Sequence, residues 1–185
     1  MTKKNHPTDR KTILIGNRIP KDFFVTKGHG ESDITIHAGS YHLALKDAGI
    51  EMGNIITYSS ILPKIANKIN KPSKITHGEV IETIMATSHG KKGKRTTAGI
   101  IYGWLYNKKT KEKYSGLVCE HNGNCTEKEI EKKLRDSLNE LYQNGFSEEY
   151  DLKEIELNIE SFVPKKVYGT VIVALCFTSY EIPLQ

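Results

Sequence analysis

Strand-like segments recur along this chain of 185 residues, and they restrict its fold more than any other feature. Each segment is rich in β-branched and aromatic residues, a composition typical of strands. We predict strands at 23–26, 54–58, 80–86, 98–106, 114–120, 155–159 and 167–177. The segments 80–86 and 98–106 flank the basic tip 91–95, so we predict that they pair as an antiparallel hairpin. Many hairpin-connected strands with few helices indicate an α+β fold, in which helices pack on mainly antiparallel sheets.

Only two segments have the pattern of a helix. We expect Ser40 to cap a short helix that Gly49 ends. The apolar face of this helix consists of Tyr41, Ala44, Leu45 and Ala48. The second pattern is clearer, because Thr126 and Glu129 have the spacing of a capping box and Gly145 stands at the far end. Apolar residues recur there at helical spacing: Ile130, Leu134, Leu138 and Leu141.

Length and composition favour one domain, 1–185. A chain with 37% hydrophobic and 26% charged residues can bury a sizeable core. No apolar run approaches the ~20 residues that span a bilayer, and residues 1–10 lack the apolar centre of a secretory signal. We therefore expect a cytoplasmic protein with a short solvated N-terminal tail and no membrane partner.

The net charge of +5 comes with two basic stretches, 64–74 and 91–95. Nucleic-acid binding is typical of basic residues interleaved with exposed aromatic residues, or of a known binding module. Neither occurs in this sequence, so we expect no nucleic-acid partner.

Two other patterns resemble binding motifs only loosely. Residues 27–31, which we expect to form a loop, contain two glycines but lack the full spacing of a phosphate cradle. Cys119, His121 and Cys125 form one loose cluster, whereas a zinc site normally shows a pair of closely spaced ligands twice. The third cysteine, Cys176, lies in a core-like strand, and an odd number of cysteines argues against a disulfide framework. We therefore expect no metal site.

An apolar strand at 54–58 runs directly into two adjacent hydroxyls, Ser59 and Ser60, and Pro63 follows three residues later. If such a turn is strained, the second serine can attack the carbonyl before it and exchange the peptide bond for an ester. The ester can then eliminate to a dehydroalanine, which hydrolyses to a pyruvoyl group. That group is an electron sink of the kind that a bound cofactor otherwise supplies. An ordinary turn is the alternative, because strands commonly end in small polar residues.

Several motifs accompany the two serines in a fixed order. They are Phe24 to Gly28 (FVTKG), Leu43 to Ile50 (LALKDAGI), Asn54-Ile55, Tyr58 to Pro63 (YSSILP), Met85-Ala86, Ala98 to Ile100 (AGI) and Gly116 to Glu120 (GLVCE). In this order and spacing, the chain resembles the pyruvoyl-dependent arginine decarboxylases, and it looks more like their bacterial branch. The resemblance covers roughly residues 23–173.

This resemblance implies a fold, an assembly and a processing step. Family members are four-layer αββα sandwiches that form trimers, sometimes paired into hexamers, with active sites between neighbouring subunits. They cleave between the two serines. Here that implies a chain 1–59 and a chain 60–185, which begins with a pyruvoyl group made from Ser60.

The resemblance also implies the reaction and its residues. Arginine would form a Schiff base with the pyruvoyl group, lose CO₂ and leave as agmatine, which serves polyamine synthesis or acid defence. Glu120 matches the family's catalytic glutamate, which protonates the α-carbon, and burial beside apolar residues would raise its pKa. Asn54 matches an asparagine near the scissile bond, where its amide steadies an oxyanion. Ser59, His42 and Leu45 fall at the substrate.

The match departs from the family at His42, where family members carry an acidic residue that helps to hold the guanidinium. A histidine cannot form the charge-assisted fork of a carboxylate. Either the placement is off by one residue, or another carboxylate (Glu31, Asp33 or Asp47) replaces it, or the substrate is another amino acid. His42 can also be a plain helix residue at an interface. An unprocessed, non-catalytic assembly subunit is the alternative from another class.

Overall fold

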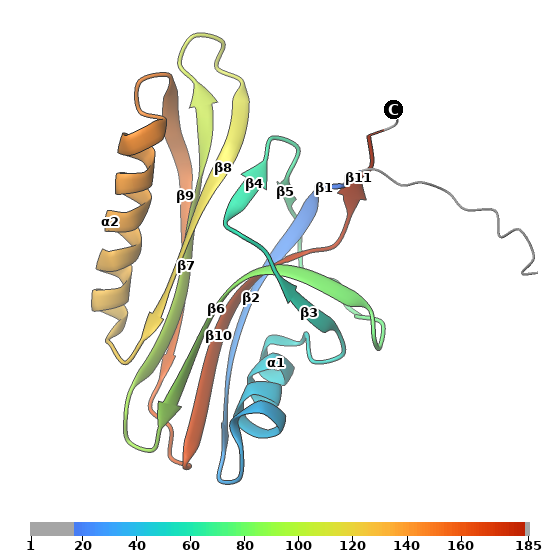
Figure 1. Cartoon of the computed structure of the whole chain (residues 1–185), viewed down its shortest axis with the longest axis vertical. Coiled ribbons are helices and arrows are strands. Elements are labelled where there is room, and N and C mark those ends of the chain that lie inside the picture. Colours follow the sequence, from blue (N-terminus) through green and yellow to red (C-terminus); the bar gives the residue numbers. More distant parts are fainter. Residues whose placement is uncertain (1–16, 184–185) are drawn as a thin grey trace, which may run out of the picture.

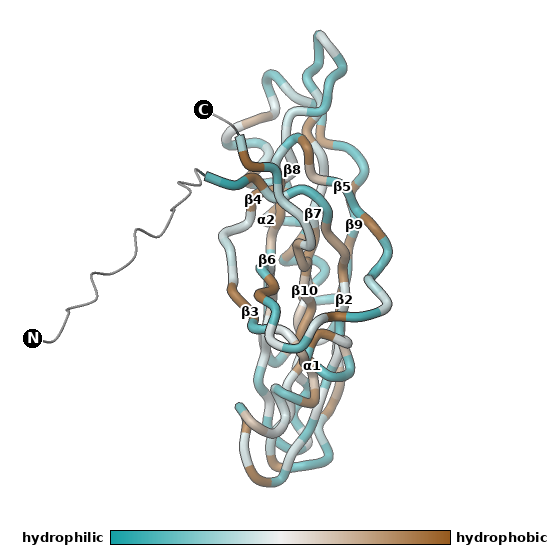
Figure 2. The backbone as a smooth tube through the Cα atoms, turned by 90° about the vertical axis from the view of Figure 1, so that its right-hand side faces the viewer, coloured by the Kyte–Doolittle hydropathy of each residue, from teal (hydrophilic) through white to brown (hydrophobic). Residues whose placement is uncertain are grey.

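Two β-sheets stacked face to face, each covered by one helix, give the molecule four layers in the order αββα (Figure 1). The computed structural model describes residues 17–183. The long strands run along the main axis, and the view in Figure 2 shows the body as long and narrow. The expected α+β fold with a four-layer sandwich is confirmed.

The larger sheet has five strands, in the order β3 (Asn54–Thr57), β6 (Val80–Lys91), β10 (Tyr168–Phe177), β2 (Asp22–Ser32) and β5 (Asn67–Lys68). The smaller sheet has four strands, in the order β4 (Ile61–Pro63), β8 (Lys113–Gly123), β7 (Thr96–Asn107) and β9 (Tyr150–Phe162). A short pair, β1 (Ile19–Pro20) with β11 (Tyr180–Glu181), lies beside them. Pairing is antiparallel except between β3 and β6 and between β2 and β5.

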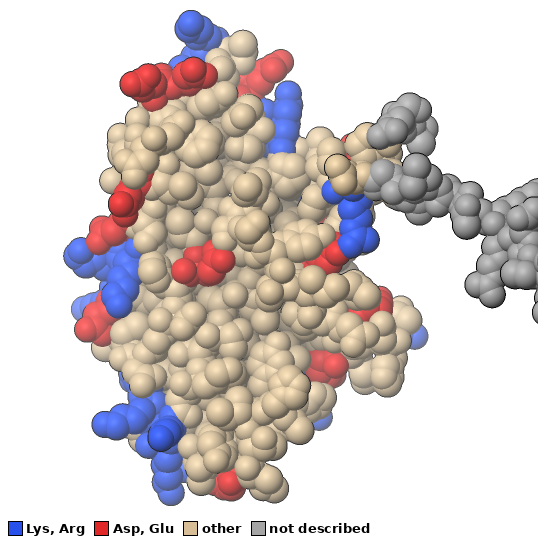
Figure 3. All heavy atoms as spheres, in the orientation of Figure 1, with Lys and Arg blue, Asp and Glu red and all other residues tan. Residues whose placement is uncertain are grey.

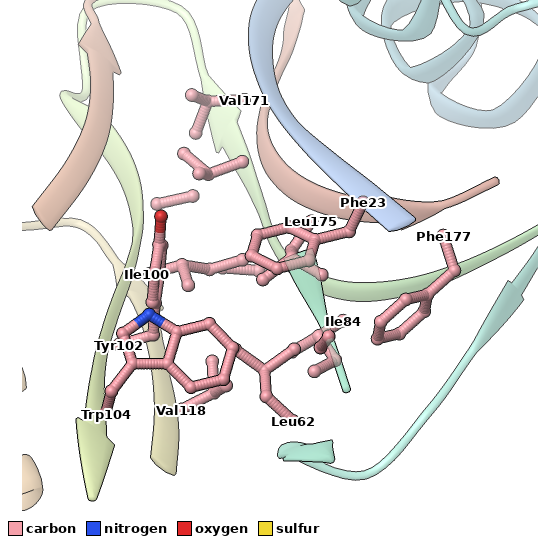
Figure 4. Close-up of a cluster of buried hydrophobic side chains, with 14 residues drawn as sticks. Phe23, Leu62, Ile84, Ile100, Tyr102, Trp104, Val118, Val171, Leu175 and Phe177 are labelled. Atoms are coloured by element: carbon pink, nitrogen blue, oxygen red, sulfur yellow. The ribbon is translucent and has the colours of Figure 1, made fainter. Parts of the chain in front are cut away.

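The central core fills the space between the two sheets (Figure 4). The rings of Phe23 from β2 and Tyr102 from β7 meet edge to face there, with centroids 5.8 Å apart. Val171 and Leu175 of β10 are fully buried in the same cluster. Because burial of each large apolar side chain contributes about 1.5–3 kcal/mol, this layer holds the sheets together.

Helix α2 (Glu127–Gly145) covers the smaller sheet and follows the prediction closely. The Thr126 hydroxyl accepts a hydrogen bond from the Glu129 N–H, and the Glu129 carboxylate accepts one from the Thr126 N–H, so the capping box is confirmed. Three of the predicted apolar positions are buried against the sheet: Ile130, Leu134 and Leu138. The fourth, Leu141, is 40% exposed at the edge of the contact.

The helical segment on the larger sheet begins earlier than the sequence predicted. A π-helical turn, η1 (Ile36–Tyr41), leads directly into α1 (His42–Ala48). Ser40 therefore lies inside the helical segment and is not its cap, and its buried hydroxyl is 2.8 Å from that of Thr170. The predicted end is confirmed, because Gly49 adopts the left-handed conformation with φ of 69°.

The two glycines at 27–31 led us to expect a loop, but that prediction is wrong. These residues belong to strand β2. Their whole length pairs with β10 in an unbroken antiparallel register. A Cβ atom on Gly28 would lie 2.5 Å from the Ala44 carbonyl oxygen, and one on Gly30 would lie 2.5 Å from the Ala44 nitrogen. The two glycines are therefore needed for the close approach of α1 to the sheet, which a local reading of the sequence cannot show.

Strands β6 and β7 do not form the predicted hairpin. The turn between them is tight, with Lys94 N–H bonded to the Lys91 carbonyl at 2.9 Å. However, β6 belongs to the larger sheet and β7 to the smaller one, so the chain crosses between the layers here. The strands face each other through side chains, and the buried hydroxyls of Ser88 and Thr96 are 2.8 Å apart.

Charged side chains are unevenly distributed over the face seen in Figure 3. Lysine, arginine and carboxylate groups lie mainly around the rim of this face, along the edge that α2 forms, at the ends and on the opposite side, whereas the middle of this face carries few of them. Within residues 17–183, no helix is long and apolar enough to cross a membrane.

Candidate active site

Ser59 and Ser60 lie where the chain passes from one sheet to the other. Strand β3 of the larger sheet ends at Thr57, and β4 of the smaller sheet begins at Ile61. On the near side the Tyr58 N–H donates to the Thr83 carbonyl at 2.7 Å, and on the far side Ile61 pairs with Leu117 of β8. The two serines thus form a short connection that is fixed at both ends.

The crossing brings Ser60 to Glu120 of β8. The Ser60 hydroxyl oxygen lies 2.6 Å from each of the two carboxylate oxygens of Glu120, and both groups are partly buried. Such a short distance between two oxygens is typical of a strong hydrogen bond between a hydroxyl and a carboxyl group. The structure therefore places the Ser60 hydroxyl and the Glu120 carboxyl group in direct contact.

The sequence predicted that Glu120 ends its strand, but the structure places it inside the strand. Strand β8 continues to Gly123, and Glu120 pairs with Ile100 in the middle of the smaller sheet. A carboxylate held inside a sheet has fewer backbone degrees of freedom than one in a loop. Burial, together with the charge of Glu120, raises the pKa of the neighbouring Cys119 to about 11, so that thiol stays protonated.

The carbonyl group of Ser59 has a backbone donor that the sequence did not predict. The N–H of Ile61 donates to it with an N···O distance of 3.0 Å, which closes a three-residue turn around Ser60. This is the carbonyl that Ser60 would attack. A hydrogen bond to its oxygen polarises the group and stabilises negative charge that develops there.

Three other predicted residues, His42, Leu45 and Asn54, line one surface pocket of about 680 Å³ between the helical segment and β3. Leu45 is buried and His42 is exposed. The Asn54 amide nitrogen donates to the Gly78 carbonyl at 3.0 Å, so it is engaged away from the two serines. The six candidates therefore form two groups in one chain: the serines with Glu120, and these three in the pocket, whose lining excludes Ser60 and Glu120.

The carboxylates considered as replacements at position 42 already accept backbone hydrogen bonds. Glu31 accepts from the Lys165 N–H at 2.7 Å, and Asp33 from the Val167 N–H at 3.2 Å. Asp47 accepts from the His29 N–H at 3.0 Å. These contacts tie all three carboxylates to local structure.

The loose Cys/His cluster is not arranged as a metal site. The His121 ring nitrogen Nε2 is 2.9 Å from the Ser137 hydroxyl on α2. In the part of the chain that the structure describes, no three His, Cys, Asp or Glu side chains are grouped to hold a metal ion.

Comparison with known proteins adds an independent line of evidence. The family model for pyruvoyl-dependent arginine decarboxylase matches residues 22–182. A pyruvoyl-dependent arginine decarboxylase of Methanococcoides burtonii is 35% identical over 86 residues, which are 45% of this chain and 47% of that protein. One from Methanocella arvoryzae is 30% identical over 119 residues, 55% of this chain and 70% of that protein.

A third relative, pyruvoyl-dependent arginine decarboxylase 1 of Archaeoglobus fulgidus, is 26% identical over 132 residues, 69% of this chain and 80% of that protein. The matched stretches thus span from about half to four fifths of the length of these relatives. The family model covers most of the chain, the fold is the expected sandwich, and Ser60 contacts Glu120. On this evidence, the chain belongs to the pyruvoyl-dependent arginine decarboxylase family.

Proposed function

We propose that the chain cleaves itself between Ser59 and Ser60, giving fragments 1–59 and 60–185, and then decarboxylates arginine to agmatine and CO₂. The observation that carries this proposal is the connection at Ser59 and Ser60, which is fixed on both sides. There the Ile61 N–H donates to the carbonyl that Ser60 would attack, and position 60 lies beside Glu120. Membership of the family supports both the reaction and the substrate.

Self-cleavage begins when Ser60 Oγ attacks the carbonyl carbon of Ser59. A C–O bond forms, the peptide C–N bond breaks, and the hydroxyl proton ends on the released amine of Ser60. The Cα proton of Ser60 is then lost as the Cβ–Oγ bond breaks, which frees Ser59 as a C-terminal carboxylate. Water replaces the nitrogen, which leaves as ammonia, and the second fragment begins with a pyruvoyl group.

Two groups are proposed to stabilise the oxyanion of the first step. The Ile61 N–H already donates to the Ser59 carbonyl oxygen, so it needs no rearrangement. Asn54 is the second, and because it lies apart from the serines in one chain, its amide would have to come from a neighbouring subunit and release the Gly78 carbonyl. The backbone donor is therefore the better supported of the two.

A pyruvoyl group at position 60 supplies an electrophilic carbonyl that takes up the substrate's α-amine and accepts the electrons left when CO₂ departs. The residues present fit such a group, because position 60 is partly buried and lies within hydrogen-bond reach of an acid–base side chain. Glu120 is proposed to hold a proton and deliver it to the α-carbon of the substrate. Ser59, His42 and Leu45 are proposed to contact the substrate.

We further propose that the active unit is a homotrimer or hexamer with sites between subunits. In one chain, the pocket that holds His42, Leu45 and Asn54 is lined without Ser60 or Glu120. A neighbouring subunit that presents its pocket to Ser60 would complete the site. The broad face with few charged side chains in Figure 3 is consistent with burial in such an assembly.

A second candidate is the same chemistry on another amino acid. His42 stands where family members have an acidic residue, and it is exposed in the pocket. A guanidinium that loses its carboxylate partner loses a charge-assisted hydrogen bond, whereas a neutral or acidic side chain does not. This observation favours a substrate other than arginine, and the Ser60–Glu120 contact favours an enzyme over the remaining alternative, an unprocessed assembly subunit.

Denaturing electrophoresis combined with CO₂ release tests these candidates together. Two fragments and release of CO₂ from arginine are expected from the purified chain. Two fragments with CO₂ from another amino acid alone would transfer the proposal to the second candidate. A single intact chain without decarboxylase activity would contradict both and favour the assembly subunit.

A further inference from the structure

Glu82 is a buried carboxylate that the proposed reaction does not use. It lies on β6 and is only 3% exposed. Its Oε1 atom accepts a hydrogen bond from Nη2 of Arg18, and its Oε2 atom is buried with no hydrogen-bond partner among the described residues. A buried carboxylate needs a cation and further donors to offset its lost hydration. One half of this carboxylate is therefore still available to a donor.

Two tyrosines complete the surroundings of the Arg18 guanidinium. Its central carbon lies 4.8 Å from the centroid of the Tyr180 ring, a favourable cation–π distance. The neighbouring Tyr58 side chain and the charge of Glu82 raise the pKa of Arg18. Burial, followed by the nearby Glu82 carboxylate, raises the pKa of both Tyr58 and Tyr180, so their hydroxyls remain neutral. The Tyr180 hydroxyl is itself buried without a hydrogen-bond partner within residues 17–183.

This set of groups is selective for one class of cation. A guanidinium is planar and can donate two parallel hydrogen bonds to a carboxylate while its face lies on an aromatic ring. An ammonium is a strongly hydrated point charge and gains less from such a site. The site is also reachable, because the Arg18 side chain is 53% exposed whereas that of Glu82 below it is 4% exposed.

We propose that Glu82, Tyr58 and Tyr180 form a guanidinium-binding site that Arg18 fills from within the chain, and that small alkylguanidinium compounds compete with Arg18 for it. Arginine and agmatine belong to this class of compound. Tyr58 directly precedes Ser59, so the occupant of the site lies next to the connection between the two sheets. The proposal does not depend on cleavage at Ser60 or on the location of the substrate pocket.

Calorimetric titration with ethylguanidinium tests the competition directly. This probe has no α-amine or carboxylate, and Ser60→Ala in every protein removes any pyruvoyl chemistry. With Arg18→Ala added, we expect ethylguanidinium to bind at least tenfold more tightly than it binds the chain that keeps Arg18. Ethylammonium, which has the same charge without the planar fork, should bind at least tenfold more weakly than ethylguanidinium.

Glu82→Gln on the same background is the matched control, because it keeps the shape of the side chain and removes its charge. Ethylguanidinium binding should be lost in that protein. Binding that survives Glu82→Gln, or that is equal with and without Arg18, would overturn the proposal. Because every protein in this titration carries Ser60→Ala, its outcome does not depend on whether the natural chain is processed. Failure of the guanidinium site and failure of the proposed function can therefore be told apart.

Removal of Arg18 leaves a buried charge unpaired, and the Arg18→Ala protein can fail to fold for that reason. In that case recovery of folding is measured by circular dichroism after addition of each probe. Recovery with ethylguanidinium but not with ethylammonium supports the site. Equal recovery with both, or with neither, contradicts it.

Discussion

The hydroxyl of Ser60 lies 2.6 Å from both carboxylate oxygens of Glu120, although 60 positions separate the two residues in the chain. The contact exists because β4 pairs with β8, which places the start of one strand beside the middle of the other. The same crossing holds the Ser59 carbonyl against the Ile61 N–H. The proposed nucleophile, the proposed acid–base group and the proposed oxyanion donor therefore meet at one connection between the sheets.

Replacement of the Glu120 carboxylate should separate processing from turnover. Glu120→Gln keeps the shape of the side chain but cannot deliver a proton, so we expect turnover to fall by at least ~10²-fold. The protein should still yield two fragments. The measurement is the initial rate of CO₂ release from fully processed protein.

The matched control is Glu112→Gln, because that carboxylate is 71% exposed in a loop after β7. Its turnover should equal that of the natural protein. Near-normal turnover in processed Glu120→Gln would remove Glu120 from the mechanism.

Loss of the Ile61 N–H should slow self-cleavage. An amide-to-ester substitution at residue 61 removes this donor and keeps the isoleucine side chain. Removal of one oxyanion donor typically costs about 10²–10³ in rate. We expect a comparable slowing in the appearance of fragment 1–59, followed by mass spectrometry.

Ile61→Val serves as its control, because it trims the 67% exposed side chain and keeps the N–H. This variant should be processed at close to the natural rate. An ester variant processed as fast as Ile61→Val would show that the hydrogen bond has no part in cleavage.

Position 42 should determine how tightly arginine binds. His42→Asp and His42→Glu restore a carboxylate in the pocket, and a hydrogen bond to a charged group contributes about 1.5–3 kcal/mol. The KM for arginine should fall correspondingly, as measured by CO₂ release across the twenty amino acids. If the chain instead acts on a neutral or acidic substrate, these variants should lose that activity.

His37→Asp is a suitable comparison, because His37 lines the same pocket but does not match the family motif. It should change the KM for arginine less than either variant at position 42. An arginine KM that is unchanged in both position-42 variants would place the substrate elsewhere.

Gly28 should tolerate no side chain. A Cβ atom there would lie 2.5 Å from backbone atoms of Ala44 and Ala48, so Gly28→Ala must push α1 away from the sheet. Overpacking of this kind typically costs about 1–3 kcal/mol. Urea unfolding should show that loss, whereas Gly145→Ala, whose Cβ would meet no atom within 4 Å, should show none.

The parts of the fold that local sequence determines were predictable. The capping box of Thr126 and the spacing of Ile130, Leu134 and Leu138 define α2 without reference to any other segment. Gly49 likewise ends α1, because a left-handed residue is needed at that point.

The errors arose where distant segments decide the outcome. Strands β6 and β7 have the alternation and the turn of a hairpin, but the partner of each lies elsewhere in the chain. The glycines of β2 wrongly predicted a loop. They are needed because α1 lies so close to the strand that no side chain fits there. Partners in a sheet depend on packing over the whole domain, which a local pattern does not contain.

Some residues of the candidate site were also predictable from the sequence, whereas others were not. The resemblance to the family identified Ser60 and Glu120, and the structure shows their contact. The hydrogen bond from the Ile61 N–H to the Ser59 carbonyl could not be predicted, because every residue type except proline has the same backbone donor. Glu82 escaped it because a glutamate in a strand usually faces solvent, and only the paired register buries this one.

The central claim is that Ser60 becomes the first residue of a second chain, and intact mass spectrometry of the purified protein tests it most directly. We expect two masses, for residues 1–59 and 60–185, with the second lighter by one ammonia than a fragment that begins with serine. Ser60→Ala should show one uncleaved mass, because alanine has no hydroxyl, and Ser59→Ala should still be cleaved. A natural chain that appears only at its full unmodified mass would contradict the account.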